Sequence, residues 1–205
     1  LGHAEISDSM VKDGLWDVYN QFHMGSAAEL CVKKYKFSRK AQDEYAIESY
    51  KRALQAQKEG HFKEEIIPIL IQVKKAEKII DFDEEPLKAK LDKIPHLKPV
   101  FDKNGSVTAA NASTLNDGAA TIILMSHKEA QKRGLKPLAK ICAYAEAAQA
   151  PEWFTTAPVQ AIKKVLNKTK LNTQDIDLYE INEAFAAVTM AAMKELNLNP
   201  KKVNV

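Results

Sequence analysis

Strand and helix patterns alternate along the chain after residue 118, and this alternation restricts the possible folds more than any other feature. A continuous apolar run at residues 119–125 is typical of a buried strand, and two further strands are expected at 138–147 and 176–181. Helical patterns stand between and after them, at residues 126–133, 158–168 and 183–196. The last of these helices is apolar on nearly all sides, so we expect it to be buried. Alternating strands and helices predict an α/β fold with a layered core.

The part of the chain before residue 118 has a different character, with more helix and more charge. A capping box of Ser26 and Glu29 predicts the start of the first helix, and Ser38 is expected to cap the second. These helices should occupy residues 26–34 and 38–60. A strand is expected at 66–73, and the charged segment 74–93 is typical of a loop with a short helix. We interpret this region as an insertion or lid.

Composition excludes several classes of protein. The 205 residues include 30 Lys and Arg against 27 Asp and Glu, a balance that argues against nucleic acid as a partner. No apolar run approaches the length of a membrane span, and no signal peptide is visible. The two cysteines, Cys31 and Cys142, form no CxxC pair, which argues against a disulfide scaffold or a zinc site. Because the chain does not begin with Met, we expect a fragment or a processed product.

Two polar residues interrupt the apolar sequence where the strand at 176–181 meets the last helix. Asn182 and Glu183 stand at this junction, where a buried amide would require specific partners. The main-chain amides at the start of a helix favour negative charge, so the junction is suited to a developing oxyanion. The alternative is that Asn182 only caps the helix.

Two further segments suggest a ligand site. Small residues are concentrated at 107–120, where they would let a ligand or another segment of backbone approach closely. A tightly packed turn would have the same composition. The segment 22–25 places His23 just before a helix, where a structural role is the competing interpretation.

Taken together, these motifs resemble the thiolase family. Residues 182–186 resemble its NEAF motif, and residues 111–113 resemble its CoA-binding loop. Residues 13–15 with 23–25 resemble the start of its loop domain. The resemblance follows the whole chain in order and is strongest to the biosynthetic, acetoacetyl-CoA type. It implies a partial, layered α/β thiolase-like fold with a helix-rich loop domain.

The family fold consists of two similar α/β halves, with the loop domain inserted in the first. The resemblance therefore implies that residues 1–117 are mainly the CoA-binding loop domain. Residues 118–205 would form the end of the N-terminal half and the start of the C-terminal half. It also implies a homodimer or homotetramer in the cytoplasm, with the mitochondrion as the alternative compartment.

The resemblance also implies an activity, that of an acetyl-CoA C-acetyltransferase acting on acetyl-CoA and acetoacetyl-CoA. A cysteine thiolate takes an acetyl group from acetyl-CoA, and a second cysteine deprotonates another acetyl-CoA, whose carbanion attacks the acetyl-enzyme. Oxyanion holes stabilise the thioester oxygens. Coenzyme A is then a substrate or product, and no cofactor is expected apart from a possible potassium ion.

Individual residues match family positions. Asn182 matches the asparagine that holds a water in one oxyanion hole, together with the His of a GHP motif. The residues implied to bind CoA or its acyl group are Leu15, His23, Met24, Lys88, Lys93, Ser113 and Phe154. Solvated surface side chains are the alternative for the two lysines. Thr155 follows Phe154, whereas relatives that accept 2-methylacetoacetyl-CoA have Pro there.

The possible potassium ion has its own set of residues. Tyr45 and the carbonyl groups of Ala109, Ala110 and Ala112 resemble the monovalent-cation loop of potassium-activated thiolases. Backbone carbonyls suit such a cation. The alternative is that Tyr45 simply packs on a helix face.

The sequence also departs from the family pattern. Neither Cys31 nor Cys142 matches a catalytic cysteine, and no GHP or CxG motif is present. The resemblance places the first catalytic cysteine before this region, and the GHP histidine and second cysteine after Val205. We therefore expect this chain alone to be inactive. The alternative is a non-catalytic thiolase-derived protein that binds CoA or a partner, and a weaker one is a lipid-carrier or ketoacyl synthase relative. The NEAF sequence favours the enzyme.

Overall fold

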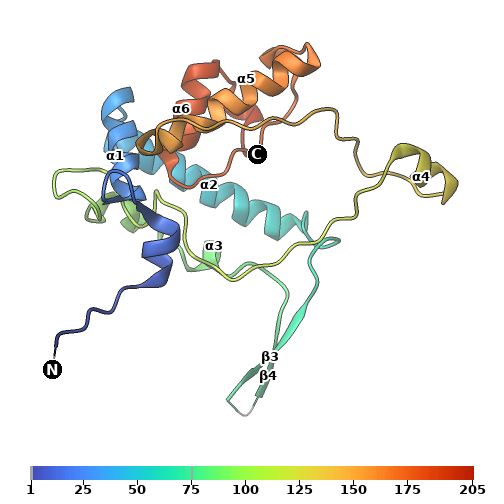
Figure 1. The fold of residues 1–205 in the computed structure, drawn as a ribbon. Coiled ribbons are helices and arrows are strands. Elements are labelled where there is room, and N and C mark those ends of the chain that lie inside the picture. The colour runs from blue at the N-terminus through green and yellow to red at the C-terminus, as the bar shows by residue number, and fades with distance from the viewer. Residues whose placement is uncertain (1, 75) are drawn as a thin grey trace.

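Four helices form the body of the molecule in the computed structural model, which describes residues 2–74 and 76–205 (Figure 1). They are α1 (Met24–Tyr35), α2 (Arg39–Glu59), α5 (Ala157–Thr169) and α6 (Ala186–Leu196). Shorter helices are α3 (Glu85–Lys88), α4 (His127–Lys132), the π-helix η1 (Val11–Leu15), and the 3-10 helices η2 (Leu91–His96), η3 (Pro151–Thr156), η4 (Thr173–Asp175) and η5 (Pro200–Lys202). Among the helices of the described residues, none has the length and apolar character needed to cross a bilayer.

Helix α6 lies at the centre of this body, in contact with α1, α2 and α5. Ala187 and Ala191 are fully buried in a cluster with Cys31 of α1. On another side of α6, Leu196 packs in a second cluster with Val159 of α5. Helix α6 has apolar residues on nearly every face, as a helix covered on several sides requires. Its expected burial is confirmed.

Local capping signals set most helix ends as expected. The Ser38 hydroxyl accepts a hydrogen bond from the Ala41 N–H at 3.1 Å, and α2 stops at Gly60, whose φ of +74° suits glycine. The Ser126 hydroxyl accepts from the Glu129 N–H at 3.2 Å at the start of α4. Helix α5 begins with Pro158 in its first turn.

The expected capping box of Ser26 and Glu29 is wrong. Helix α1 begins two residues earlier, and the Nδ1 atom of His23 accepts a hydrogen bond from the Gly25 N–H at 3.0 Å. Glu29 is buried, and its carboxylate accepts from the N–H groups of Ser106 and Val107, each at 2.7 Å. A buried carboxylate requires hydrogen-bond donors. For Glu29 the main-chain amides of the distant loop supply them, and not the amides at the start of α1.

Two of the three strands expected after residue 118 are also wrong. Residues 119–125 and 138–147 are extended, but they belong to no strand, because no neighbouring segment in the described ranges forms a ladder with them. The third, 176–181, contributes only a parallel bridge between Tyr179 and Val203. Ile122 and Ile123 are consequently 78% and 83% exposed.

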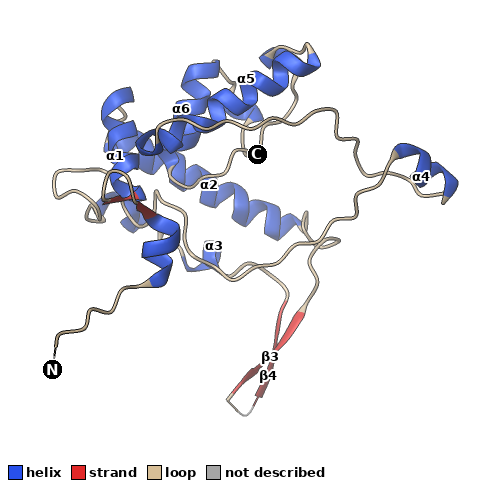
Figure 2. Cartoon of the chain, viewed as in Figure 1, coloured by secondary structure: helices blue, strands red, loops and turns tan. Residues whose placement is uncertain are grey.

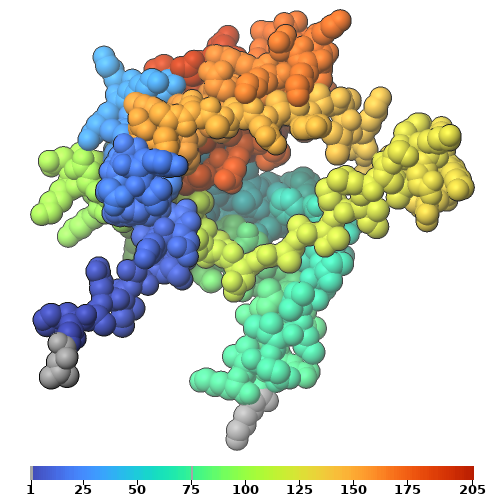
Figure 3. Space-filling model, viewed as in Figure 1, coloured from blue at the N-terminus to red at the C-terminus, as the bar shows by residue number. Residues whose placement is uncertain are grey.

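Within the described residues, the sheets that form are two antiparallel pairs (Figure 2). Strand β1 (Trp16–Asp17) pairs with β2 (Phe22–His23), and β3 (Ile69–Val73) pairs with β4 (Ala76–Ile80). Strand β3 lies inside the expected strand 66–73. The segment 74–93 was expected to be a loop with a short helix. Its first part is instead strand β4, and the expected short helix is present as α3. The hairpin β3–β4 and the segment carrying α4 both project from the helical body (Figure 3).

Candidate functional site

The small-residue stretch and the junction before α6 lie side by side. The Ser113 N–H donates to the Ala184 carbonyl oxygen at 3.0 Å, and the Ala186 N–H donates to the Asn111 carbonyl oxygen at 2.9 Å. An antiparallel bridge pairs Ala112 with Phe185 between these two bonds. The two motifs that the sequence analysis singled out therefore form one structural unit.

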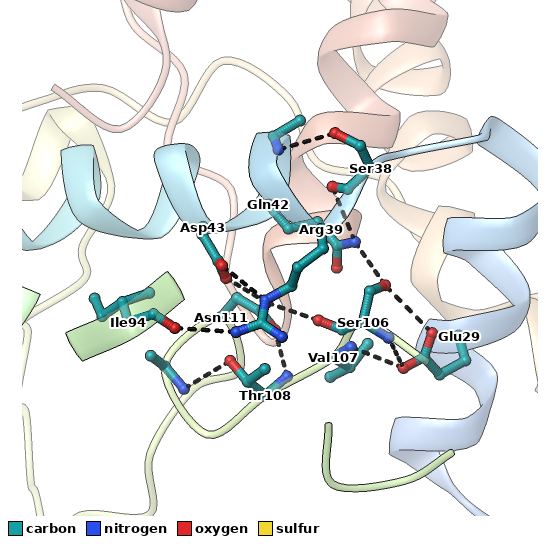
Figure 4. A network of polar contacts seen from close by, with 12 residues as sticks. Glu29, Ser38, Arg39, Gln42, Asp43, Ile94, Ser106, Val107, Thr108 and Asn111 are labelled. Carbon is teal, nitrogen blue, oxygen red and sulfur yellow. Dashed lines mark hydrogen bonds and ion pairs between the residues drawn. The ribbon is translucent and has the colours of Figure 1, made fainter. Parts of the chain in front are cut away.

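Asn111 fixes the shape of the loop on its side of this unit (Figure 4). Its side chain is buried and donates to Asp43 Oδ1 at 3.1 Å and to the Ser106 carbonyl oxygen at 3.0 Å. Its Oδ1 atom accepts from the Thr108 N–H at 2.8 Å. Arg39 in turn donates to Asp43 Oδ2 at 2.7 Å. A fully satisfied buried network of this kind gives the loop a single conformation.

The side chains of α1 and α2 complete the support of the same loop (Figure 4). Gln42 is buried and donates to the Ser106 hydroxyl at 2.8 Å. Glu29 receives the two main-chain amides of Ser106 and Val107 described above. The loop that precedes Ser113 is thus anchored by side chains of two separate helices.

A cavity of about 300 Å³ opens against this loop. Helices α2 and α3, residues 110–114 and the start of α6 contribute to its lining. Four of the residues singled out from the sequence line it, namely Tyr45, Ala110, Ala112 and Ser113. Ala109, the fifth residue of that group, is exposed and lies outside the lining. The volume is at the lower end of the range for ligand sites.

Glu183 links the cavity to helix α2. Its carboxylate accepts hydrogen bonds from the Tyr45 hydroxyl at 2.5 Å, from the Ser49 hydroxyl at 2.6 Å and from Asn204 Nδ2 at 2.7 Å. Burial, and then the adjacent carboxylate of Glu183, raise the pKa of Tyr45 well above its ordinary value. Glu183 was not predicted as a site residue from the sequence, where its only signal was a polar side chain at an apolar junction.

Asn182 is exposed and lines a neighbouring cavity of about 630 Å³ together with Glu183 and Asn204. Helix α6 begins only at Ala186, and Phe185 is its N-cap. The alternative role of Asn182 as a helix cap is therefore wrong, and so is the expectation that its amide is buried. Within the described residues its side chain forms no hydrogen bond, which leaves both polar atoms of the amide available to a ligand or a water.

Aromatic rings connect two of the expected pocket residues. His23 stacks on Phe101 with ring centroids 4.7 Å apart, and Phe101 meets Phe185 edge-on at 6.3 Å. Phe154 approaches Phe185 from another side at 6.4 Å. Gly25 is required beside this row, because a Cβ atom there would lie 2.3 Å from the Phe101 ring. Phe101 and Phe185 were missed from sequence, although Phe185 belongs to the 182–186 motif.

The remaining candidates lie at the ends of short elements. Leu15 is half-buried at the end of η1, and Met24 is half-buried at the start of α1. Lys88 is the last residue of α3 and Lys93 lies in η2, and both are exposed. Helix α3 lines the 300 Å³ cavity through two other residues, Glu85 and Pro86.

The two cysteines lie in unlike surroundings. Cys31 is fully buried, and burial raises the pKa of its thiol. Its Sγ atom lies 3.8 Å from the Ala187 carbonyl oxygen inside the helical body. Cys142 is exposed in the extended segment before η3. Neither lines the two cavities that hold Ser113 and Asn182.

Comparison with known families matches almost the whole chain. The model "Thiolase, N-terminal domain" matches residues 1–128, and the model "Thiolase, C-terminal domain" matches residues 135–205. The chain belongs to the thiolase family.

Curated relatives extend this result. An acetyl-CoA acetyltransferase of Yarrowia lipolytica is 50% identical over 205 residues, which cover 100% of this chain and 52% of the relative. A mitochondrial acetyl-CoA acetyltransferase of Rattus norvegicus is 50% identical over 206 residues, covering 100% of this chain and 49% of the relative. The chain thus spans about half the length of the curated relatives it matches.

Solved structures confirm the fold. An acetyl-CoA acetyltransferase of Bacillus anthracis superposes with a TM-score of 0.95 at 43% identity, over 100% of this chain and 52% of the other. The Acat5 thiolase of Ascaris suum in complex with coenzyme A gives 0.92 at 44% identity, over 99% and 52%. The expectation of a partial α/β thiolase fold is confirmed. Because the first superposition covers the whole chain, it includes the extended segments that form no sheet here.

Proposed function

We propose that the complete protein is an acetyl-CoA C-acetyltransferase, which condenses two acetyl-CoA molecules or cleaves acetoacetyl-CoA with coenzyme A. The observation that carries this proposal is the pairing of residues 111–113 with residues 184–186, which joins the CoA-binding loop to the NEAF motif. The names of the relatives and the coenzyme A complex of the Ascaris neighbour support it.

In this proposal Asn182 acts on the oxyanion of the reaction. Its exposed amide, without a partner among the described residues, is available to hold a water that faces the thioester oxygen. Negative charge develops on that oxygen in the transition state, so a fixed donor stabilises the transition state more than the bound substrate. The nucleophilic cysteine, the basic cysteine and the GHP histidine would come from the rest of the protein.

The same proposal assigns the coenzyme A side of the site. Ser113 would contact the pantetheine arm at the 300 Å³ cavity. Leu15, His23 and Met24 would border the acyl end and the pantetheine arm, with His23 held by stacking on Phe101. Phe154, packed edge-on against Phe185, would border the acyl group. Lys88 and Lys93 are exposed cations, suited to the phosphates of the nucleotide.

A potassium ion is a further part of the proposal. Tyr45, Ala110, Ala112 and Glu183 line the cavity, and each carries an oxygen atom of the kind that a hard cation prefers. Ala109 does not line it, so the residues fit the ion in part. A bound ion would supply positive charge beside the loop that leads to Ser113.

The proposal also covers the domain organisation, the oligomeric state and the cellular compartment. Residues 1–117 would be mainly the loop domain, and residues 118–205 would join the two α/β halves. The extended segments 119–125 and 138–147 would then pair with strands from the rest of the protein. We propose a homodimer or homotetramer in the cytoplasm, with the mitochondrion as the alternative, since relatives include mitochondrial enzymes.

The experiment is an assay of the complete protein with acetoacetyl-CoA and coenzyme A, following loss of the acetoacetyl thioester. Turnover that disappears when the upstream cysteine is replaced by Ala supports the proposal. The matched control is Cys142→Ala, which should retain full turnover because Cys142 lies outside both cavities. Binding of coenzyme A without any turnover would instead favour the non-catalytic alternative.

A further inference from the structure

Asn204 ends the parallel pairing between Tyr179 and Val203 that holds the segment before Asn182. The Tyr179 N–H donates to the Lys202 carbonyl oxygen at 2.7 Å, and the Asn204 N–H donates to the Tyr179 carbonyl oxygen at 2.8 Å. Asn204 then turns into the left-handed region, with φ of 49°. Its backbone therefore leaves the ladder at this residue, and the next rung must be made by another group.

The side chain of Asn204 makes that rung. The Ile181 N–H donates to Asn204 Oδ1 at 2.8 Å, and Asn204 Nδ2 donates to the Ile181 carbonyl oxygen at 2.8 Å. A primary amide carries one acceptor and two donors, so it can replace a peptide group in a ladder. Both polar groups of the residue that precedes Asn182 are thus held by one side chain.

The second Nδ2 proton of Asn204 is donated to Glu183, the residue that follows Asn182. Asn204 Nδ2 donates to the Glu183 carboxylate at 2.7 Å, and Tyr45 and Ser49 of α2 donate to the same carboxylate. Arg52 of α2 also donates to the carbonyl oxygens of Val203 and Asn204, at 2.8 and 3.0 Å. The two neighbours of Asn182 are therefore tied to each other and to a long helix, while the Asn182 side chain has no hydrogen bond among the residues that the structure describes.

We propose that Asn204 is a positioning residue for Asn182, acting through Ile181 and Glu183. This inference depends on the proposed function, because it assigns Asn182 to the oxyanion. A catalytic amide must be held within a fraction of an ångström, and displacement by about 1 Å can cost a hundredfold in rate. Asn204 supplies that constraint by holding the backbone on one side of Asn182 and a side chain on the other.

The test is a double-mutant cycle on the complete enzyme, with kcat, KM and melting temperature measured for every variant. Asn204→Gly removes the amide without backbone strain, since glycine accepts positive φ. We expect Asn204→Gly to lower kcat about tenfold to a hundredfold with little change in KM. In the Asn182→Ala background the same substitution should cause no further loss of kcat, because its effect passes through Asn182.

Melting temperature separates positioning from folding. Loss of the rung should lower the melting temperature to the same extent in both backgrounds, while the loss of kcat occurs in only one. Asn199→Ala is the matched control, because Asn199 caps the neighbouring η5 by accepting from the Lys201 N–H at 3.0 Å and has no hydrogen bond to residues 181–183. That variant should retain kcat within about twofold.

Two results would overturn the role of Asn204 but leave the proposed function intact. One is an equal loss of kcat from Asn204→Gly in both backgrounds, and the other is normal kcat in Asn204→Gly while Asn182→Ala is impaired. Normal kcat in Asn182→Ala would instead refute its role in the proposed function, and the inference with it. If Asn204→Gly does not fold, Asn204→Asp keeps the acceptor for Ile181 and loses both donors, and the same cycle applies.

Discussion

The main-chain N–H of Ser113 donates to the carbonyl oxygen of Ala184 at 3.0 Å. This bond joins the loop proposed to hold the pantetheine arm to the motif that carries Asn182. On one side the loop is anchored by Asn111, and on the other the motif is anchored by Asn204. Main-chain hydrogen bonds therefore connect two segments that are each anchored separately to the rest of the chain.

We predict that Asn182→Ala in the complete enzyme lowers kcat by roughly a hundredfold or more, since one preorganised donor contributes on the order of 3 kcal/mol to the barrier. KM should change little, because the ground-state carbonyl bears less charge than the oxyanion. Steady-state kinetics and melting temperature are measured on the same variant. A lowered melting temperature with unchanged kcat would refute the catalytic role.

We predict that the 205-residue chain, purified alone, cleaves no acetoacetyl-CoA. Cys31 is buried, which raises its thiol pKa, and Cys142 lies outside both cavities, so we expect neither to serve as the nucleophile. The complete enzyme is assayed in parallel as the positive control. Turnover by material whose intact mass matches 205 residues would overturn the assignment of roles.

We predict that the complete enzyme binds coenzyme A more tightly in potassium than in sodium at equal ionic strength, by at least about fivefold. Tyr45→Phe should abolish the difference, because it removes the hydroxyl oxygen from the cavity. Tyr19→Phe is the control, since Tyr19 is 81% exposed. Calorimetric titration gives both affinities, and equal values in the two salts would count against the cation site.

We predict that acetoacetyl-CoA is the preferred substrate over 2-methylacetoacetyl-CoA, because Thr155 replaces the proline that follows the pocket phenylalanine in enzymes accepting the branched substrate. One additional methyl group in a packed pocket commonly changes kcat/KM by about tenfold or more. The measurement compares kcat/KM for both substrates. A clear preference for the branched substrate would show that the proline is dispensable.

We predict that Asn111→Ala lowers the free energy of unfolding of the complete enzyme by about 2–3 kcal/mol, since it leaves buried groups of Asp43 and Thr108 and the half-buried Ser106 carbonyl without their Asn111 partner. Asn104→Ala is the matched control at an exposed position and should change stability by less than about 0.5 kcal/mol. Denaturant titration measures both. Equal stability of the two variants would contradict the structural role of the network in Figure 4.

The sequence predicted helices better than strands, and the reason lies in the range of the interactions. Ser38, Ser126 and Pro158 act within one turn of their own helices, so their effect is visible in a short window. Residues 119–125 have the composition of a buried strand, yet a strand also requires a hydrogen-bonded neighbour that no local pattern specifies.

In the candidate site, too, interactions between residues distant in sequence could not be predicted. The residues gathered at the 300 Å³ cavity, such as Tyr45 and Ser113, were named through a family resemblance rather than from periodicity. The roles of Glu29 and Asn204 were not predictable, because each side chain satisfies backbone groups far away in sequence. Asn182 was expected where a strand meets a helix, whereas Tyr179 makes an isolated bridge and α6 begins at Ala186 with Phe185 as its N-cap.

The solvent-exposed apolar run at Ile122, Ile123 and Leu124 affects how this chain associates with other copies of itself. These side chains are 78%, 83% and 68% exposed on an extended backbone whose amides have no ladder partner in the ranges 2–74 and 76–205. A segment with high β-propensity, no charge and no proline recruits identical segments from other molecules. In the 205-residue chain purified alone, this stretch should therefore promote self-association.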